Sequence, residues 1–373
     1  MARKQFLSFL LIFSLLISCA SALAEADDDD DWDDNVDDAW EMEHPLHSGD
    51  YAYALLDDGT VEITSYGGAD TEIVIPDTLD GKPVTAIGER AFYYSLSLTS
   101  VTIPDSVTHI SQKAFSCCFQ LTSITLPSGL TAIESGTFDL CKSLTTIDIP
   151  DSVAAIADDA FIGCKALQSF TLSPNHPYFF LADDALCRTA DSTLLLYPNA
   201  REPRTYRIPD GITAISAYAF YDCDLLESVV VPDSVTQLPA RAFSGCSVLA
   251  SVSLPDSLTE VGTAAFSGCS ALTGIRIPAA ITEIINHTFS GCTSLATLEI
   301  PDSVTKIGDY AFFGCTSLTS IAIPDSVTAI GNGAFSNCTA LTLTVTPDSY
   351  AAEYAQANNI PYTYPDANGW LNN

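Results

Sequence analysis

Apolar positions recur at a fixed spacing along most of this chain. A proline marks each copy of the pattern, and within two runs these prolines stand 23 residues apart: Pro104, Pro127 and Pro150, then Pro209, Pro232, Pro255, Pro278, Pro301, Pro324 and Pro347. In the complete copies, apolar residues stand one before, three after and six after the proline. Phe stands eleven after it, and Leu seventeen after it. A fixed period of this length predicts a solenoid, in which each unit packs only against its neighbours.

The pattern inside one unit predicts short elements. The stretch before each proline, for example L-T-S-I-T-L at residues 121–126, alternates apolar and hydroxyl side chains, which predicts a strand with one buried face. The proline ends this strand, and P-D-S predicts a turn in which Asp or Ser bonds the amide two residues on. A second apolar pair, as in V-T-A-I, predicts another extended segment. A-F-S-G-C predicts one helical turn closed by glycine, as at Gly245 and Gly268.

These residues resemble the BspA-like leucine-rich repeat family of bacterial surface proteins over about residues 51–364. The resemblance implies a leucine-rich repeat solenoid, rich in β-structure with short helical turns, of about ten 23-residue units. We expect repeats 1–4 at residues 76–172, with five extra residues (79–83) in the first, and repeats 5–10 at residues 209–346. Residues 49–75 are expected to form an N-terminal β-hairpin cap, and residues 347–373 a C-terminal cap and tail.

The N-terminus predicts export. Residues 1–24 carry Arg3 and Lys4, then an apolar run and small residues, which is typical of a signal peptide and too short to span a membrane. Cleavage after Ala24 would release the protein. The sequence L-I-S-C ending at Cys19 also fits a bacterial lipobox, in which Cys19 becomes the lipid-bearing N-terminus. Both alternatives place the protein outside the cell or at its surface, and lipid on Cys19 would be its only contact with a membrane.

Charge is concentrated after the signal peptide. The chain has a net charge of −33, and residues 25–43 hold 12 acidic groups and no basic one. Such a run repels itself, so residues 25–48 are predicted to be an acidic disordered linker. Calcium binding by Asp27–Asp31 is the alternative, although the run lacks the ligand spacing and glycine of an EF-hand loop. The acidic balance excludes nucleic acid as a partner, because phosphate contacts need clustered Lys and Arg.

Cysteines follow the repeat. Of the 12 in the chain, nine occupy one position of the unit: Cys118, Cys141, Cys164, Cys223, Cys246, Cys269, Cys292, Cys315 and Cys338. Stacked equivalents should lie ~4.8 Å apart with parallel Cβ vectors, whereas a disulfide needs Cβ atoms ~3.8 Å apart. We therefore predict a buried ladder of free thiols that act as small apolar residues. A strained bridge between Cys117 and Cys118 is the alternative.

The sequence offers no constellation for catalysis. The five histidines are scattered, no glycine-rich phosphate loop is present, and the serines sit at repeated turn and strand positions. We expect no metal, no cofactor and no enzymatic activity. Asp follows the proline in most units, as at Asp105 and Asp302, which predicts a row of turn-forming side chains or, alternatively, weak cation binding. Ser128 and Ala279 interrupt this row.

One segment breaks the period. Between Pro150 and Pro209 there are 36 residues more than one unit requires, at residues 173–208, and we expect a β-hairpin flap there. Tyr and Arg are common anchors of recognition surfaces. The candidate binding residues are therefore Tyr178, Phe179, Arg188, Tyr197, Arg201, Arg204 and Arg207, with Tyr218 and Tyr221 of the next unit. Under the alternative, structural interpretation the aromatic rings pack on the solenoid, and the arginines pair with local acids such as Asp183 and Asp184.

The sequence thus predicts a non-enzymatic solenoid that presents an extended surface for macromolecular contact. The resemblance implies adhesion or protein binding, with a partner on a host or on the cell envelope. Recognition of a glycan or cell-wall polysaccharide is one alternative, and would need exposed aromatic rings at residues 173–208. A structural surface spacer without a specific ligand is another.

Overall fold

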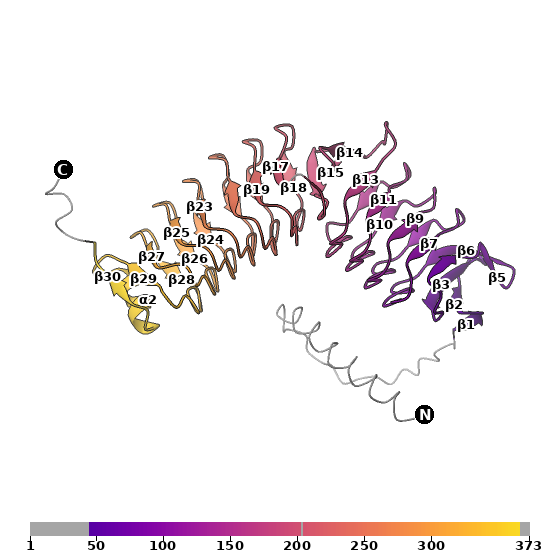
Figure 1. Ribbon diagram of the computed structural model, residues 1–373, viewed down its shortest axis with the longest axis horizontal. Helices are drawn as coiled ribbons and strands as arrows, with labels where there is room; N and C mark the ends of the chain where they lie inside the picture. The colour runs from indigo at the N-terminus through magenta and orange to yellow at the C-terminus, as the bar shows by residue number, and fades with distance from the viewer. Residues whose placement is uncertain (1–44, 203, 366–373) are drawn as a thin grey trace, which may run out of the picture. The chain divides into compact units, whose positions relative to one another are not determined.

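The computed structural model describes residues 45–202 and 204–365 (Figure 1). The predicted signal peptide, Cys19 and the acidic run at residues 25–43 lie outside the described residues, so those predictions stand as they were made. Between Leu46 and Thr363 the chain forms a right-to-left stack of solenoid turns in the view of Figure 1, with strands in almost every turn.

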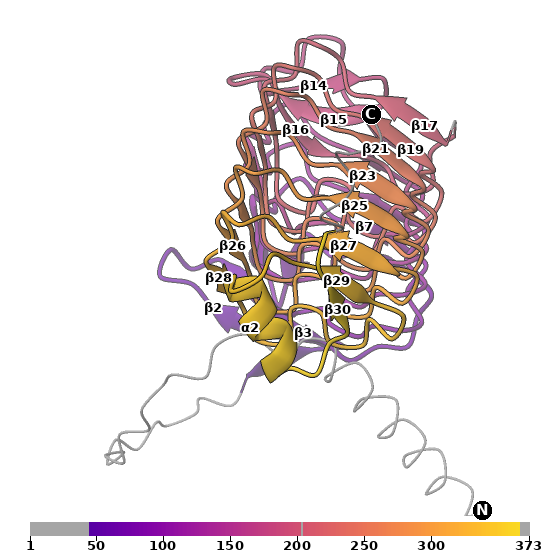
Figure 2. The ribbon, with the colours of Figure 1, turned by 90° about the vertical axis from the view of Figure 1, so that its left-hand side faces the viewer.

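Two series of short strands run along the stack, on opposite sides in the view of Figure 2. The first series has three residues in each strand: β4 (Glu72–Val74), β7 (Ser100–Thr102), β9 (Ser123–Thr125), β11 (Thr146–Asp148), β13 (Ser169–Thr171), β17 (Thr205–Arg207), β19 (Ser228–Val230), β21 (Ser251–Ser253), β23 (Gly274–Arg276), β25 (Thr297–Glu299), β27 (Ser320–Ala322) and β29 (Thr342–Thr344). The second has two: β8 (His109–Ile110), β10 (Ala132–Ile133), β12 (Ala155–Ile156), β18 (Ala214–Ile215), β20 (Gln237–Leu238), β22 (Glu260–Val261), β24 (Glu283–Ile284), β26 (Lys306–Ile307) and β28 (Ala329–Ile330).

Strands of successive turns pair in parallel and in register. Ser228 pairs with Ser251, for instance, so that equivalent residues of two units lie side by side. In β21 the central Val252 is buried, while Ser251 and Ser253 are exposed on either side of it. The predicted alternation of buried and exposed side chains is therefore confirmed. The residues that flank each buried central residue form the outward face of the first series.

The turn after each proline is closed by the backbone. The Val235 N–H donates to the Pro232 carbonyl oxygen at 3.1 Å, and equivalent bonds recur along the stack. Because this backbone bond closes the turn, the carboxylate of the aspartate can accept hydrogen bonds from another residue. Oδ1 of Asp105 accepts the backbone N–H and the hydroxyl of Ser128, one turn later, at 2.8 and 2.9 Å. The prediction of a turn-forming aspartate is thus wrong at Asp105, whose carboxylate instead links two turns.

The core contains a column of rings and a column of thiols. Phe266 lies between Phe243 and Phe289, with ring centroids 5.5 and 5.7 Å away and planes within 3° of parallel. The nine equivalent cysteines carry no disulfide, and only Cys338, the last, is partly exposed. Most of these thiols donate to the carbonyl oxygen of the phenylalanine one turn earlier, as Cys118 does to Phe92 at 3.1 Å.

The N-terminal end begins the solenoid earlier than expected. β1 (Leu46–Ser48), β2 (Tyr51–Leu55) and β3 (Val61–Tyr66) are antiparallel, and β5 (Thr78–Leu79) forms a hairpin with β6 (Lys82–Ile87). Residues 46–48 are therefore a paired strand, and the prediction of a disordered linker up to residue 48 is wrong there. β3 pairs in parallel with β6, and Tyr66 stacks on Phe92 at 5.3 Å, so the first solenoid turn starts at Val61, inside the predicted cap.

The C-terminal end is covered by a helix, α2 (Tyr350–Ala357). Ser349 caps it, because its Oγ accepts the Ala352 N–H at 3.2 Å. Ala351 and Ala355 are buried against the last turn, and β30 (Tyr362–Thr363) adds to the edge of β29. These elements cover the exposed end of the stack, as a solenoid requires.

Residues 173–208, here called the enlarged turn, form one long solenoid turn. β14 (Phe179–Ala182), β15 (Ala185–Arg188) and β16 (Thr193–Leu196) make a three-stranded antiparallel meander, and β16 then pairs in parallel with β18. The Tyr197 N–H donates to the Ala219 carbonyl at 2.8 Å, as Phe220 does to Ala242 one turn later at 2.9 Å. Tyr197 thus occupies the phenylalanine position, and a meander replaces the expected hairpin flap.

The meander also joins two parts of the core. One cluster of buried residues runs from Tyr53 to Leu195, and the other from Ala185 to Ala355. Strand β15 serves both, since Leu186 belongs to the first cluster while Cys187 belongs to the second. The column of stacked rings is interrupted at the same place: among the described residues, no ring contact joins Phe161 to Tyr197.

Candidate functional site

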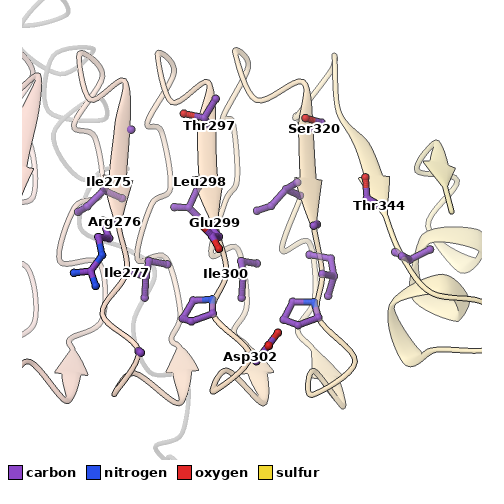
Figure 3. Close-up of a pocket in the computed structure, with 18 of the residues that line it drawn as sticks. Ile275, Arg276, Ile277, Thr297, Leu298, Glu299, Ile300, Asp302, Ser320 and Thr344 are labelled. Carbon is purple, nitrogen blue, oxygen red and sulfur yellow. The ribbon is translucent and has the colours of Figure 1, made fainter. Parts of the chain in front are cut away.

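The outward face of the first series is hollowed between β17 and β29. Two cavities of 620 and 1150 Å³ adjoin there and share Arg276. We call them together the sheet groove; its characteristic residues are Arg207, Asp256, Arg276, Glu299, Asp302 and Thr344. Figure 3 shows Arg276 and Glu299 on neighbouring strands, β23 and β25, with Asp302 on the turn that follows. The groove exists because the residues flanking each buried strand position face outward, beside the proline turns.

The charges in the groove are mostly paired. Arg207 lies 3.1 Å from Asp210, and Arg276 lies 2.5 Å from Asp256, with all four side chains largely exposed. Glu299 has no basic partner among the described residues. Exposed pairs of this kind contribute little to stability, so their charges remain available for exchange with a ligand.

The groove is lined by groups that form hydrogen bonds and ion pairs. Hydroxyl groups of Thr297, Ser320 and Thr344 line it between the charges. No histidine lines either cavity to activate one of these hydroxyls as a nucleophile. The arrangement therefore offers hydrogen bonds and ion pairs along an extended, rigid surface.

Two of the five aromatic residues predicted as contacts are buried. Phe179 is 2% exposed and Tyr197 is 1% exposed, because both fill the core of the enlarged turn. The prediction of these two as binding residues is wrong for that reason. Tyr178, which is 44% exposed, does lie at the surface.

The four arginines predicted as contacts all have acidic partners. Arg188 forms two bonds with Asp191, at 3.0 and 2.8 Å, and this contact lowers the pKa of the Asp191 carboxyl to about 2. Arg201 is nearly buried and contacts Asp184 at 3.0 Å as well as the Tyr197 hydroxyl at 3.3 Å. These bonds hold the meander in place, which favours the structural interpretation of the enlarged turn.

Arg204 and Arg207 lie at the end of the enlarged turn. Arg204 contacts Glu227 of the next turn at 2.9 Å, with its side chain half exposed. Arg207, at the end of β17, is the arginine of this segment that also lines the sheet groove. The predicted set is therefore divided between the core, the meander and the groove.

Tyr218 and Tyr221 lie elsewhere, on the side of the solenoid formed by the A-F-x-x-C turns, here called the turn face. Their rings meet edge to face, 5.7 Å apart. Arg241, one turn later, lies over the Tyr218 ring at 5.9 Å, and its Nη1 donates to the Tyr218 hydroxyl at 3.3 Å.

Sequence reasoning missed the exposed aromatic residues Tyr310 and Phe313 of the same face. They stand at positions that vary from unit to unit, so the repeat did not draw attention to them. The signal was that neighbouring units hold Gly333 and Ser336 at the equivalent positions.

Within residues 45–202 and 204–365, no group of three or more His, Cys, Asp or Glu side chains is arranged to hold a metal ion. In the same part of the chain, no helix combines the length and the apolar composition that a membrane span requires.

Comparison with known proteins places the chain among repeat proteins. The model of the "BspA type leucine rich repeat region (6 copies)" matches residues 71–181 and 213–342. A leucine-rich cell surface protein from Faecalibacterium prausnitzii is 31% identical, with 86% of this chain and 98% of that chain covered and a TM-score of 0.51.

More distant structures share the fold alone. A leucine-rich repeat protein from Eubacterium ventriosum is 23% identical over 78% of this chain and 93% of its own, with a TM-score of 0.59. The pneumococcal vaccine antigen PcpA is 16% identical over 87% of this chain and 99% of its own, with a TM-score of 0.53. A search of curated proteins found no match.

Proposed function

Because this chain belongs to the BspA-type leucine-rich repeat family, we propose that it is a bacterial surface or secreted protein that binds a protein partner through the sheet groove. The observation that carries the proposal is the groove itself, a long hollow on the face of β17–β29 with Arg, Asp, Glu and hydroxyl side chains. It is non-enzymatic in this proposal, and its activity is adhesion.

The rigidity of the groove supports binding of an extended partner. Each strand that carries a groove residue pairs in parallel with a strand of a neighbouring turn, as Arg207 in β17 does with Val230 in β19 and Arg276 in β23 with Glu299 in β25. A surface that is already ordered loses little conformational entropy on association. Many weak contacts along several turns can therefore combine into useful affinity.

The route to the surface is part of the proposal. Residues 1–24 direct export, and either cleavage after Ala24 releases the protein or lipid on Cys19 anchors it. Mass spectrometry of the mature N-terminus distinguishes the two outcomes. An acylated Cys19 indicates an anchored protein, whereas an N-terminal Glu25 indicates a released one.

A matched pair of substitutions tests the groove. Ala322→Trp places a large side chain in the groove from β27, while Ala329→Trp places the same side chain on β28, in the second series of the same turn. Binding to arrays of matrix and envelope proteins is the measurement. We expect the Ala322 variant to lose binding while the Ala329 variant keeps it.

The outcomes separate the alternatives. Equal binding by both variants and the parent chain would remove the groove from the proposal. Binding to a glycan array in place of the protein array would support the polysaccharide alternative, although Tyr197 and Phe179 of the enlarged turn are buried and cannot stack on a sugar. A folded protein that binds on neither array would support a spacer.

A further inference from the structure

Two aromatic pairs on the turn face are structural equivalents. Tyr310 and Phe313 stand 92 residues, or four periods of 23, after Tyr218 and Tyr221. Both pairs meet edge to face, at 5.7 Å and 64° for the first and at 5.9 Å and 74° for the second. Their surroundings, however, differ, first of all in the residue one period later.

The first pair is covered and the second is open. Arg241 follows Tyr218 by one period and lies over its ring, 5.9 Å from the centroid. The residue that follows Tyr310 by one period is Gly333, which has no side chain to cover the ring; a Cβ there would lie 2.7 Å from Cε1 of Tyr310. Tyr310 is accordingly 41% exposed and Phe313 is 36% exposed.

The open ring is held in place from its other side. His287, one turn earlier, stacks on Tyr310 with centroids 5.2 Å apart and planes 17° from parallel. His287 and Tyr310 both adopt a left-handed backbone, with φ of 58° and 52°, as do Arg90, Lys113, Tyr218, Arg241 and Ala264 at the same position of other units. The left-handed backbone is therefore a property of this position, and the stacking on His287 is what holds the Tyr310 ring.

The surrounding charge favours a cation. Asp309 adjoins the ring, and its Oδ1 accepts the Asn332 N–H at 2.7 Å; it has no basic partner among the described residues. The whole chain carries a net charge of −33. Cations are attracted to the faces of aromatic rings. Arg241 over Tyr218 shows that the equivalent first pair accommodates a guanidinium group.

We propose that Tyr310, with Phe313, His287 and Asp309, receives an arginine side chain of the partner protein, in the position that Arg241 occupies over Tyr218. We call these four residues the tyrosine platform. The proposal rests on the proposed function, since it assumes a protein partner, but it does not depend on the sheet groove.

Filling the platform from within tests it. Gly333→Arg blocks it in two ways: its guanidinium takes the open position, and its Cβ, which would lie 2.7 Å from Cε1 of Tyr310, displaces the ring. Arg241 adopts the same left-handed backbone at the equivalent position, with φ of 57°. The control is Gly136→Arg, which adds the same charge at another left-handed position of this column, φ 61°, beside the flexible Lys113. Tyr310→Ala removes the ring, and Arg241→Gly opens the first pair, Tyr218 and Tyr221.

The probe is a fluorescein-labelled Gly-Arg-Gly-Arg-Gly peptide, with lysine and glutamine versions, titrated at physiological salt and followed by anisotropy. We expect the arginine peptide to bind more tightly than the glutamine peptide. Gly333→Arg and Tyr310→Ala should each weaken it about two- to fivefold, while Gly136→Arg should not. Arg241→Gly should increase the number of peptides bound.

Equal affinities for the Gly333 and Gly136 variants, or for the arginine and glutamine peptides, would overturn the platform. That failure is distinguishable from failure of the proposed function: a chain whose protein binding depends on Ala322 but not on Tyr310 retains the groove and loses only the platform.

Discussion

The Sγ atom of Cys246 lies 2.9 Å from the backbone carbonyl oxygen of Phe220, one turn earlier in the stack. The same bond recurs from Cys269 to Phe243 at 3.1 Å. The cysteines are therefore more than small apolar residues, because most of these thiols add a second donor to a buried carbonyl oxygen; that of Phe220 also accepts the Cys223 N–H at 3.3 Å.

Replacement of Cys246 by Ala removes both the hydrogen bond and part of the packing. We expect the free energy of unfolding to fall by about 1–2 kcal/mol, as measured by urea denaturation. Cys338→Ala is the matched control, because this thiol makes the same bond at 3.0 Å but is partly exposed at the end of the stack. A loss at Cys338 as large as that at Cys246 would contradict the argument from burial.

Burial should also suppress the reactivity of the ladder. Desolvation raises the pKa of the Cys118 and Cys292 thiols to about 12, so the reactive thiolate is scarce at pH 8. We expect slow modification by a disulfide reagent in the folded protein, with Cys338 reacting first. In denaturant without reductant, all ladder thiols should be counted; their disappearance in pairs would show disulfides instead.

The ring column should dominate stability within a turn. Phe266 is fully buried between two parallel rings, and truncation to Ala should reduce the free energy of unfolding by about 3–5 kcal/mol. Phe313→Ala, in the neighbouring column at the surface, should cost less than about 1 kcal/mol. Thermal unfolding of the two variants against the parent chain makes the comparison.

The enlarged turn offers a test between its two interpretations. Tyr197 is a core residue in the structure, so Tyr197→Ala should destabilise the protein by several kcal/mol, on the order of a buried aromatic truncation. Tyr178→Ala, at an exposed position of the same turn, should leave stability nearly unchanged. A larger loss of stability for Tyr178→Ala than for Tyr197→Ala would instead support Tyr197 as a contact residue.

The carboxylate of Asp139 should make the free energy of unfolding fall as the pH rises. Burial, with a contribution from Asp159, raises the pKa of Asp139 to about 6, so the folded protein binds this proton more tightly than the unfolded chain does. Below about pH 4 both states are protonated and the group has no effect. Between about pH 4 and 6 the unfolded chain loses this proton while the folded state keeps it, so stability falls over that range, and above about pH 6 the full penalty of the poorly solvated charge is present.

Asp139→Asn should therefore stabilise the protein at pH 7, by about 1–2 kcal/mol after allowance for partial exposure. At pH 4 the variant and the parent should unfold at the same denaturant concentration. Denaturation curves at the two pH values measure the difference, and a variant that is less stable at pH 7 would contradict it.

Much of the fold could be predicted because the same apolar positions recur in every complete unit. The positions of Phe266 and Cys246 recur at one spacing, so their shared burial follows from the period alone. The enlarged turn could not be predicted in the same way. The spacing does place Tyr197 one period of 23 residues before Phe220, but it gives no sign of the antiparallel strands β14 and β15 that precede it, which have no counterpart in the other units.

The candidate surfaces were harder to predict for a related reason. A repeat defines the core, whereas a contact surface consists of positions that vary between units, such as that of Arg276, which holds Thr102 and Ser253 in two others. Residues chosen for composition alone, such as Phe179, proved to be buried. Only the structure shows that Gly333 leaves Tyr310 uncovered while Arg241 covers Tyr218.

The in-register pairing of β19 with β21 means that a turn makes bonds only with the turns on either side of it. An in-frame duplication or deletion of a single 23-residue unit would thus recreate every contact it interrupts, and would change the length of the stack by ~4.8 Å. The length of the solenoid can accordingly change during evolution by whole units, while the packing of the core stays the same. The enlarged turn differs, because it occurs once in the sequence and joins two core clusters. Its duplication or deletion would not recreate the contacts that it interrupts.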